Sequence, residues 1–246
     1  MTTMTLDELL PDDVACAIGT NRHGRYCVPV ALRHRPVAQA ILTGEVWEPK
    51  VLDLLAAHPS CDIVHAGAFF GDFLPALARS RKPGARVWAF EPSAENFACA
   101  QSTLRLNALD NVELVHAGLG ERAETRLLSS RRGGKSLGGW CTFSDTAATD
   151  GLPSPGPGSE LARVVTIDEV VPVDRHVGAI QLDVDGFEGP ALRGGIRTIT
   201  RCRPVLVIES APGFDVLDQP WFHEQILSLG YEKIGYLHEN VVLFPT

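Results

Sequence analysis

The chain has 246 residues, a length that suits one large α/β domain, or one domain with an extension, and that can bury a substantial core. Its formal net charge of −8 argues against nucleic acid as the main partner, because binding to a phosphate backbone relies on clustered Lys and Arg. The N-terminal MTTMTLDELLPDD lacks the apolar core of a secretory signal, and no apolar run approaches the roughly 18 residues that a membrane helix needs, so we expect a cytoplasmic protein without a membrane partner.

The six cysteines, at positions 16, 27, 61, 99, 141 and 202, are scattered and form no C-x-x-C pair. Several of them lie within apolar segments. This pattern favours reduced, mostly buried thiols over a disulfide framework or a zinc site, and we expect no metal.

Residues 1–57 are expected to form an N-terminal extension, and residues 58–246 the main domain. Within the extension, GRYCVPVAL (24–32) is expected to be extended, and Glu48–Ala57 to form a helix leading into the first core strand.

Continuous apolar runs, which are typical of strands covered on both faces, recur at residues 61–67, 85–91, 112–118, 178–186 and 203–210. Stretches with helical spacing lie between most of them, at residues 72–81, 94–106, 187–200 and 221–229. This alternation predicts a doubly wound, mostly parallel sheet, because parallel neighbours need a crossover connection.

The first core strand runs into IVHAGAFFGDFLP (63–75), a glycine turn followed by helical spacing. Gly67 and Gly71 are spaced G-x-x-x-G, not G-x-G-x-x-G as in a pyrophosphate cradle. A strand, glycine turn and helix in this order form a site for nucleotide-like cofactors in α/β proteins, although the same connection is common without a ligand. His65 occupies the strand tip, where a carboxylate is often found.

Glu91 ends the second strand, 20 residues after Gly71. An acid at this position holds a ribose diol in dinucleotide-binding folds, because a carboxylate accepts from two vicinal hydroxyls. Pro92 then stops the strand, and Ser93 is placed to cap the next helix. The alternative is that Glu91 itself caps that helix.

His116 ends the third strand and is followed by the small residues Ala117 and Gly118, which leave space for a flat adenine. His116 is a candidate adenine contact or general base. The alternative is a buried core histidine with satisfied hydrogen bonds.

Residues 121–168 form an insertion with a strand-like ETRLLSS (124–130), an aromatic segment GGWCTFSD (138–145) and a Pro- and Gly-rich DGLPSPGPGSE (150–160) that we expect to be a mobile loop. Trp140 and Phe143, flanked by glycines, predict a lid over a ring-shaped substrate. The alternative is an apolar patch that buries a homodimer contact.

The fourth strand ends in LDVDGFEG (182–189), where Asp183, Asp185 and Glu188 cluster. Clustered carboxylates at a strand end cost free energy unless they contact a positive, protonated or hydrogen-bonding group. Glu188 has an alternative role, because an acid is also favourable at a helix N-terminus. A divalent metal held by Asp183 and Asp185 is an alternative with thin support.

The C-terminal YEKIGYLHENVVLFPT (231–246) reads as two strands joined by the short turn His238–Asn240. So short a link makes an antiparallel hairpin. This ending is not usual for a dinucleotide dehydrogenase, and with the missing G-x-G-x-x-G it counts against a nucleotide-dependent oxidoreductase.

Taken together, AGAFFGD (66–72), FEP (90–92), HAGLG (116–120), LDVDGFEGPALRG (182–194) and RPVLVIE (203–209) resemble the motif series of the FkbM-type S-adenosylmethionine-dependent methyltransferases. The resemblance implies a class I methyltransferase fold, Rossmann-like, with a seven-stranded sheet that ends in an antiparallel hairpin. It implies S-adenosylmethionine as cofactor and, usually, O-methylation of a sugar or secondary metabolite as in natural product or glycan biosynthesis.

The resemblance and the strand-end positions together assign residues to three roles. Cofactor-binding candidates are Glu48, His65, Gly67, Ala68, Phe69, Gly71, Asp72, Glu91, Pro92, Ser93, His116, Ala117, Gly118 and Asp183. Acceptor-binding candidates are Trp140, Phe143, Asp185 and Glu188, and the candidate general bases are Asp183 and His116.

The sequence departs from the family pattern D-x-G-A-N-x-G in the loop. His65 replaces the acid, Phe69 replaces the asparagine, and Gln181 stands where a lysine is common. The acid for the cofactor's ammonium is then Glu48, Asp72 or Asp183. The changes also leave open a non-catalytic member that keeps the fold as a binding or assembly module.

Overall fold

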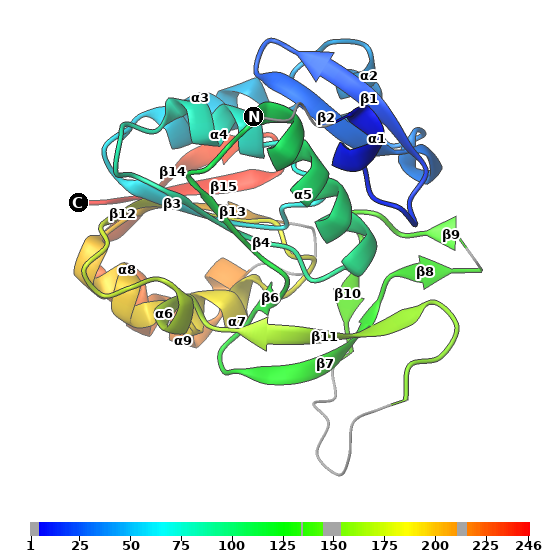
Figure 1. Cartoon of the computed structure of the whole chain (residues 1–246). Coiled ribbons are helices and arrows are strands. Elements are labelled where there is room, and N and C mark those ends of the chain that lie inside the picture. Colours follow the sequence, from blue (N-terminus) through cyan, green and yellow to red (C-terminus); the bar gives the residue numbers. More distant parts are fainter. Residues whose placement is uncertain (1–4, 134, 145–153, 211–215) are drawn as a thin grey trace.

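Seven strands form the main sheet among the residues that the computed structural model describes, which are 5–133, 135–144, 154–210 and 216–246 (Figure 1). The strand order is β14-β15-β13-β12-β3-β4-β5, and β15 runs antiparallel to both of its neighbours while the other pairs are parallel. The strands are β3 (Asp62–Ala66), β4 (Val87–Phe90), β5 (Val112–Val115), β12 (Val177–Leu182), β13 (Val205–Glu209), β14 (Tyr231–Leu237) and β15 (Asn240–Pro245). The expected doubly wound sheet with a terminal hairpin is confirmed.

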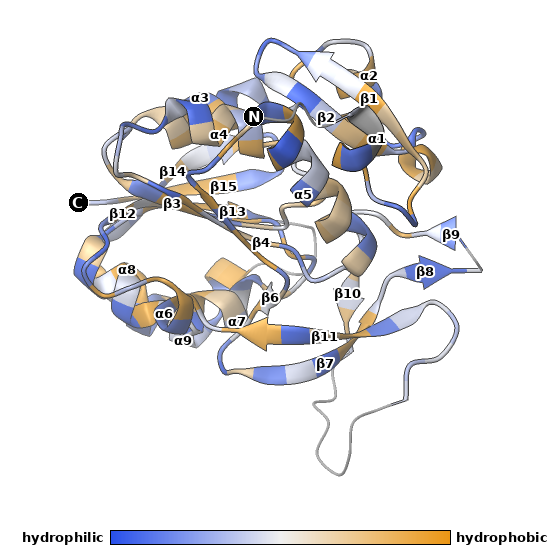
Figure 2. Cartoon of the chain, in the orientation of Figure 1, coloured by the Kyte–Doolittle hydropathy of each residue, from blue (hydrophilic) through white to orange (hydrophobic). Residues whose placement is uncertain are grey.

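Helices cover both faces of this sheet (Figure 1). One face packs against α3 (Pro49–Ala56), α4 (Leu74–Ser80) and α5 (Ala94–Asn107). The other packs against α6 (Ile167–Val170), α7 (Glu188–Arg193), α8 (Ile196–Cys202) and α9 (Pro220–Gln225), with the short 3-10 turns Val216–Asp218 and Leu227–Leu229 nearby. The central strands are largely hydrophobic, as strands covered on both faces must be (Figure 2). Within the described part of the chain, no helix is both long and apolar enough to cross a membrane.

The N-terminal region builds a third, smaller core. It contains α1 (Leu6–Leu9), the antiparallel hairpin of β1 (Cys16–Asn21) and β2 (Gly24–Pro29), the 3-10 turn Val30–Leu32 and α2 (Pro36–Leu42). The buried Tyr26, Val28 and Leu32 pack in one cluster with Phe69 and Phe70 of the glycine-turn loop. The extension therefore rests directly on the predicted cofactor loop.

The insertion, together with β6 just before it, forms a second sheet beside the main one, in the order β10-β7-β11-β6 (Figure 1). Its strands are β6 (Gly118–Leu119), β7 (Glu124–Ser129), β10 (Thr142–Phe143) and β11 (Ser159–Val165). The hydrophilic strands β8 (Arg131–Arg132) and β9 (Lys135–Ser136) form a separate two-stranded sheet near it (Figure 2). The expected strand at 124–130 is confirmed. Of the loop expected at 150–160, residues 150–153 lie outside the described residues, and β11 already begins at Ser159.

Two predicted elements are divided. The helix expected over 187–200 is two helices, α7 and α8, separated by Gly194 and Gly195. A Cβ atom on Gly194 would lie 1.9 Å from the Gly120 carbonyl oxygen, so the close approach of these two backbones breaks the helix. The strand expected over 112–118 is likewise divided, because Gly118 and Leu119 leave the main sheet and pair with β11.

Candidate active site

A pocket of about 430 Å³ lies at the carboxyl ends of β3, β4, β12 and β13. This is the edge at which doubly wound sheets bind ligands. Its predicted lining residues are Glu48, Gly67, Phe69, Asp72, Glu91, Pro92, Gly118, Trp140, Phe143, Asp183 and Asp185. The structure thus brings most of the predicted site residues together in one cavity.

Gly67 allows two strand ends to meet at the base of this pocket. Its φ is +85°, and a Cβ atom there would lie 2.0 Å from the carbonyl oxygen of Asp183. The amide of Asp183 in turn donates to the carbonyl of Ala66 at 3.2 Å. Glycine at position 67 therefore fixes the position of the Asp183 backbone as well as that of the loop.

Glu91 ties the loop to the start of α5. Its Oε2 accepts from the Phe69 amide at 2.8 Å, and its Oε1 accepts from the Ser93 amide at 2.9 Å and from the Asn96 Nδ2 at 3.3 Å. The carboxyl is 3% exposed, and burial raises its pKa to about 8 although these hydrogen bonds lower it. Glu91 thus contacts the start of α5, as expected if it caps that helix, and it also lines the pocket. The Ser93 side chain, expected from the sequence to cap α5, makes no cap hydrogen bond.

The loop residues next to Glu91 explain the two consecutive phenylalanines. Phe69 has a left-handed φ of +50° and lines the pocket, while Phe70 is fully buried against the N-terminal hairpin. In this apolar loop, Phe70 therefore packs in the core and Phe69 lines the cavity.

Asp183 and Glu209 form an acid pair in the pocket, at the ends of β12 and β13. Asp183 is in contact with solvent inside the pocket, yet desolvation by the surrounding protein raises its pKa well above the ordinary value. The charge of Glu209 and a hydrogen bond between the two carboxyls raise it further, because they favour the protonated form. Glu209 ends the fifth apolar run, so the strand-end rule that pointed to Asp183 also identifies this residue.

Glu48 lies between the loop and the C-terminal hairpin. It precedes α3 with a left-handed φ of +44°, and its Oε2 accepts from the Asn240 Nδ2 at 3.2 Å. Burial raises the pKa of Glu48. Asp72, on the same side of the loop, has its pKa raised to about 7, mainly by desolvation. Two acids thus stand near the loop in place of the one missing at position 65.

Asp185 and Glu188 differ in their surroundings. Asp185 has a left-handed φ of +47°, lines the pocket and has its pKa raised to about 7, mainly by desolvation. Glu188 is 4% exposed, and its Oε1 accepts from the amides of Val184 and Gly186. Glu188 therefore holds the loop before α7 through these two hydrogen bonds, and it does not line the pocket.

The predicted residues that do not line the pocket are His65, Ala68, Gly71, Ser93, His116, Ala117 and Glu188. His65 is buried within β3, where its Nδ1 lies 2.5 Å from Gln181 Oε1 and its ring stacks on Phe73. His116 is exposed and stacks on Phe97, with ring centroids 4.5 Å apart. Neither histidine reaches the cavity, and of the two candidate bases only Asp183 does.

The insertion and the N-terminal region meet over the pocket mouth. Trp140 is 65% exposed, and the Arg35 guanidinium lies 3.8 Å from its ring centroid. Arg35 also donates from Nη2 to the Leu137 carbonyl at 2.5 Å. Phe143 lines the pocket and packs on Phe187, with centroids 4.9 Å apart.

Several lining residues are not predicted as site residues from the sequence. They are Arg35, Trp47, Asn96, Gly138, His238, Glu239 and Asn240. Each belongs to an extension, a helix or a turn whose position against the strand ends depends on long-range packing; Asn240 and Glu48 are 192 residues apart in the chain.

Comparison with known proteins agrees with this geometry. A model of the FkbM methyltransferase domain matches residues 65–236. The crystal structure of a methyltransferase FkbM from Methylobacillus flagellatus KT is 20% identical, with a TM-score of 0.52, and the match covers 97% of this chain and 56% of that chain. The present chain therefore spans little more than half the length of that relative.

Two further solved structures are similar at lower scores. A SAM dependent methyltransferase from Aquifex aeolicus is 13% identical with a TM-score of 0.44, covering 80% of this chain and 87% of its own. An rRNA methylase from Streptococcus thermophilus is 14% identical with a TM-score of 0.45, covering 80% and 94%. No curated protein matches the chain. Because the family match extends over most of the chain and the fold agrees with it, the chain belongs to the FkbM methyltransferase family, which has the class I fold and takes S-adenosylmethionine as methyl donor.

Proposed function

We propose that this chain is an O-methyltransferase that methylates a hydroxyl group of a small acceptor, such as a sugar or a secondary metabolite. The observation that carries the proposal is the position of Glu91 and Asp183 in one strand-end pocket. Glu91 is suited to bind a ribose, and Asp183 is suited to accept a proton. Donor binding and base catalysis would then share one cavity.

The residues present fit the donor. Glu91 keeps lone-pair capacity on Oε2 for a ribose hydroxyl, since among the described residues that oxygen accepts one hydrogen bond, from the Phe69 amide. Asn96 is 2% exposed, lines the pocket and has no hydrogen-bond partner for Oδ1 among the described residues, and the same is true of Asn240 at 3%. Buried, unpaired polar atoms that face a cavity are expected where a ligand completes the hydrogen bonding. Glu48 and Asp72 would hold the donor's ammonium group.

Asp183 is the proposed general base. Bound S-adenosylmethionine supplies a methyl group activated by its sulfonium charge. As a hydroxyl attacks that methyl group it loses its proton, and the ionised form of a carboxyl with a raised pKa accepts a proton more readily than an ordinary carboxylate. Glu209 contributes by raising the proton affinity of Asp183.

The charge of the pocket supports a small neutral or cationic acceptor over a nucleic acid. Its acidic lining residues are Glu48, Asp72, Glu91, Asp183, Asp185, Glu209 and Glu239. Arg35 is the single Arg or Lys among the described lining residues. Phosphates would be repelled by this surface. Trp140 and Phe143 would cover a ring-shaped acceptor.

Transfer of a labelled methyl group tests the proposal. The wild-type protein, incubated with labelled S-adenosylmethionine and a panel of sugars and hydroxylated metabolites, is expected to label at least one acceptor, with the label in an ether. Asp183→Asn is expected to lower the rate by about 100- to 10,000-fold, as loss of a general base does.

Two variants serve as controls for this assay. Glu232→Gln, an exposed acid on β14, should keep the rate. A rate lost in His116→Gln and kept in Asp183→Asn would overturn the base assignment. Binding of S-adenosylmethionine without transfer to any acceptor would favour the non-catalytic module, and binding of NAD(P)H in its place would favour the oxidoreductase.

A further inference from the structure

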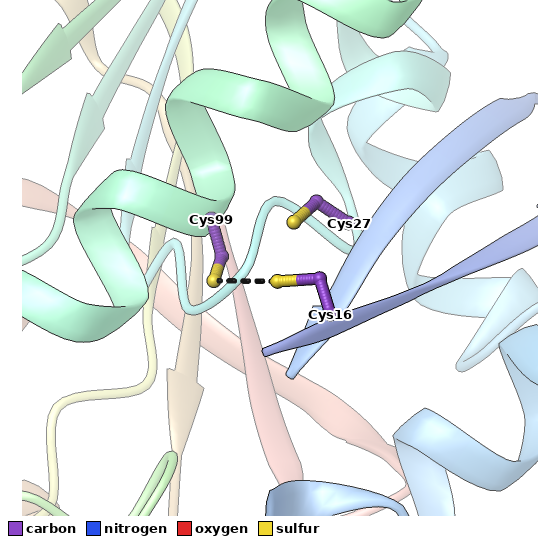
Figure 3. A group of neighbouring side chains, drawn as sticks. All are labelled: Cys16, Cys27 and Cys99. Carbon is purple, nitrogen blue, oxygen red and sulfur yellow. Dashed lines mark hydrogen bonds between the residues drawn. The ribbon is translucent and has the colours of Figure 1, made fainter. Parts of the chain in front are cut away.

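Three cysteines that are far apart in the sequence meet between the N-terminal hairpin and α5 (Figure 3). Cys16 comes from β1, Cys27 from β2 and Cys99 from α5, and their sulfur atoms all lie within 4.8 Å of one another. Cys27 and Cys99 are fully buried, and Cys16 is half-buried, so the cluster touches solvent on one side.

The sulfur separations suit a metal ion better than a disulfide bond. The Sγ atoms of Cys16 and Cys99 are 3.7 Å apart. Tetrahedral zinc with Zn–S bonds of about 2.3 Å holds its sulfur ligands about 3.8 Å apart, whereas a disulfide needs about 2.05 Å. A zinc ion therefore requires almost no movement of this pair, and the third sulfur, on Cys27, needs to move by about 1 Å at most.

A fourth ligand is available on the same helix. Ser102 follows Cys99 by three residues, so both side chains lie on one face of α5. The Ser102 hydroxyl is fully buried and interacts with the Cys27 thiol, yet its oxygen makes no hydrogen bond of ordinary geometry to any described residue. A buried oxygen without a partner leaves one hydrogen-bonding or ligand position to be completed, by an ion or by an ordered water molecule.

We propose that Cys16, Cys27 and Cys99 bind one zinc ion, with Ser102 or a water molecule as the fourth ligand. Zinc is the choice because three sulfur ligands select soft metals and the 3.7 Å separation of Cys16 Sγ and Cys99 Sγ matches that of two sulfur ligands on a tetrahedral zinc ion. Binding displaces the thiol protons to solvent and changes no oxidation state. The ion would join the β1–β2 hairpin to α5, in the same core as Phe69 and Phe70.

This site could not be predicted from the sequence, because the chain lacks the C-x-x-C spacing of common zinc sites. In the β1–β2 pairing Cys16 lies opposite Pro29 and Cys27 opposite Ile18, so the two cysteines are diagonal neighbours only because these strands pair. Cys99 joins them through the packing of α5 on β2. This proposal replaces the expectation, based on spacing, that the cysteines hold no metal.

Metal binding by the reduced full-length protein tests the proposal. After removal of metal with a chelator, the protein is titrated with Co²⁺, then with zinc in competition with a chromophoric chelator. We expect one ion per chain and a thiolate-to-cobalt charge-transfer band. Cys16→Ala should bind zinc at least about 100-fold more weakly, and Cys202→Ala, a buried cysteine outside the cluster, should bind as the wild type does.

Alkylation of the wild-type protein gives a second readout that needs no variant. Zinc should protect Cys16 from iodoacetamide, while the similarly half-buried Cys61 and Cys141 should react equally with and without the ion. The proposal is overturned if zinc gives no protection of Cys16, if the cobalt complex lacks the thiolate band, or if Cys16→Ala binds zinc as the wild type does. Peptide mapping that finds a Cys16–Cys99 disulfide in a protein unable to bind zinc would also overturn it.

Discussion

His65 and Gln181 lie side by side on β3 and β12, and this contact connects two departures from the family pattern. The strands pair in a register that sets His65 against Gln181, and the side chains meet at 2.5 Å. Burial lowers the pKa of His65 to about 4, so the imidazole is neutral at physiological pH. Where the family pattern of the resemblance has an acid and commonly a lysine, this protein has a neutral hydrogen-bonded pair. We infer that the two changes are coupled and that the donor's ammonium is held elsewhere in the pocket.

A double-mutant cycle tests this coupling. His65→Asp alone buries a carboxylate beside an amide, and we expect it to lower the free energy of unfolding by about 3–5 kcal/mol, because the charge has no partner. Adding Gln181→Lys should recover at least about 1 kcal/mol of that loss through a new ion pair. Urea unfolding of the four proteins measures the interaction, and strictly additive losses would contradict it.

The buried Glu91 gives the ligand-free protein a defined pH dependence. Its pKa is raised to about 8 in the folded chain, from 4.5 in the unfolded one, so the folded state binds the extra proton between these values. Stability from this group is therefore complete below about pH 4.5 and is lost as the pH rises toward 8, at up to about 1.4 kcal/mol per pH unit.

Scanning calorimetry between pH 5 and pH 8 checks this dependence. The Tm of the wild-type protein should fall across the range more steeply than that of Glu91→Gln, which has no proton to lose. Since about 1 kcal/mol corresponds to about 2–4 °C in a chain of this size, the difference is measurable. Parallel slopes in the two proteins would show that Glu91 does not titrate there.

At the scale of elements, Gly67 in the turn after β3 can be compared with Gly84 in the turn between α4 and β4. Gly67 has a φ of +85° and Gly84 a φ of +93°, so alanine is strained at both. At Gly67 the new Cβ atom also meets the Asp183 carbonyl at 2.0 Å, whereas nothing lies within 4 Å of it at Gly84. Gly84→Ala should cost about 1–2 kcal/mol of stability, and Gly67→Ala clearly more, with loss of donor binding.

Chemical unfolding and donor titration of the two alanine variants measure this difference. Equal losses of stability in both, with donor binding kept, would contradict the close approach of the loop to the Asp183 backbone.

The elements of the main sheet are predictable because their signal is local. Strands covered on both faces are largely apolar, so β3, β4, β12 and β13 appear in the sequence as mostly apolar runs. The break between α7 and α8 is not predictable in this way. It depends on Gly194 approaching the backbone of Gly120, a contact that exists only after the second sheet has formed.

At the scale of the whole molecule, the pocket is built from parts that the sequence presents separately. Strand ends supply Glu91 and Asp183, which follow from the sheet topology and could be predicted. The N-terminal region supplies Arg35 and the C-terminal turn supplies Asn240, and only tertiary packing brings them to the same cavity. Sequence patterns therefore identify the strand-end residues of the pocket and some of its other lining residues, such as Glu48, Trp140 and Phe143, but not those of the N-terminal region and the C-terminal turn that only tertiary packing brings there.

The shared core of the N-terminal region and the cofactor loop predicts an effect at a distance. Leu32 is fully buried in the cluster that contains Phe69 and Phe70, and Ile226 is fully buried on the other side of the main sheet. Leu32→Ala and Ile226→Ala should each cost about 2–5 kcal/mol of stability. Under conditions where both remain folded, only Leu32→Ala should weaken binding of S-adenosylhomocysteine, as measured by calorimetry. Equal affinities would mean that the extension does not support the loop.

The central claim is that the strand-end pocket holds the methyl donor through Glu91. Calorimetric titration with S-adenosylhomocysteine tests it most directly, since product binding needs no knowledge of the acceptor. At about pH 9, where the Glu91 carboxyl is ionised, we expect one-to-one binding to the wild-type protein, no binding of NADPH, and an affinity about 10- to 100-fold weaker in Glu91→Gln, as expected for the loss of a charged hydrogen-bond acceptor. The absence of binding to the wild-type protein, or an unchanged affinity in Glu91→Gln, would contradict this account of the site.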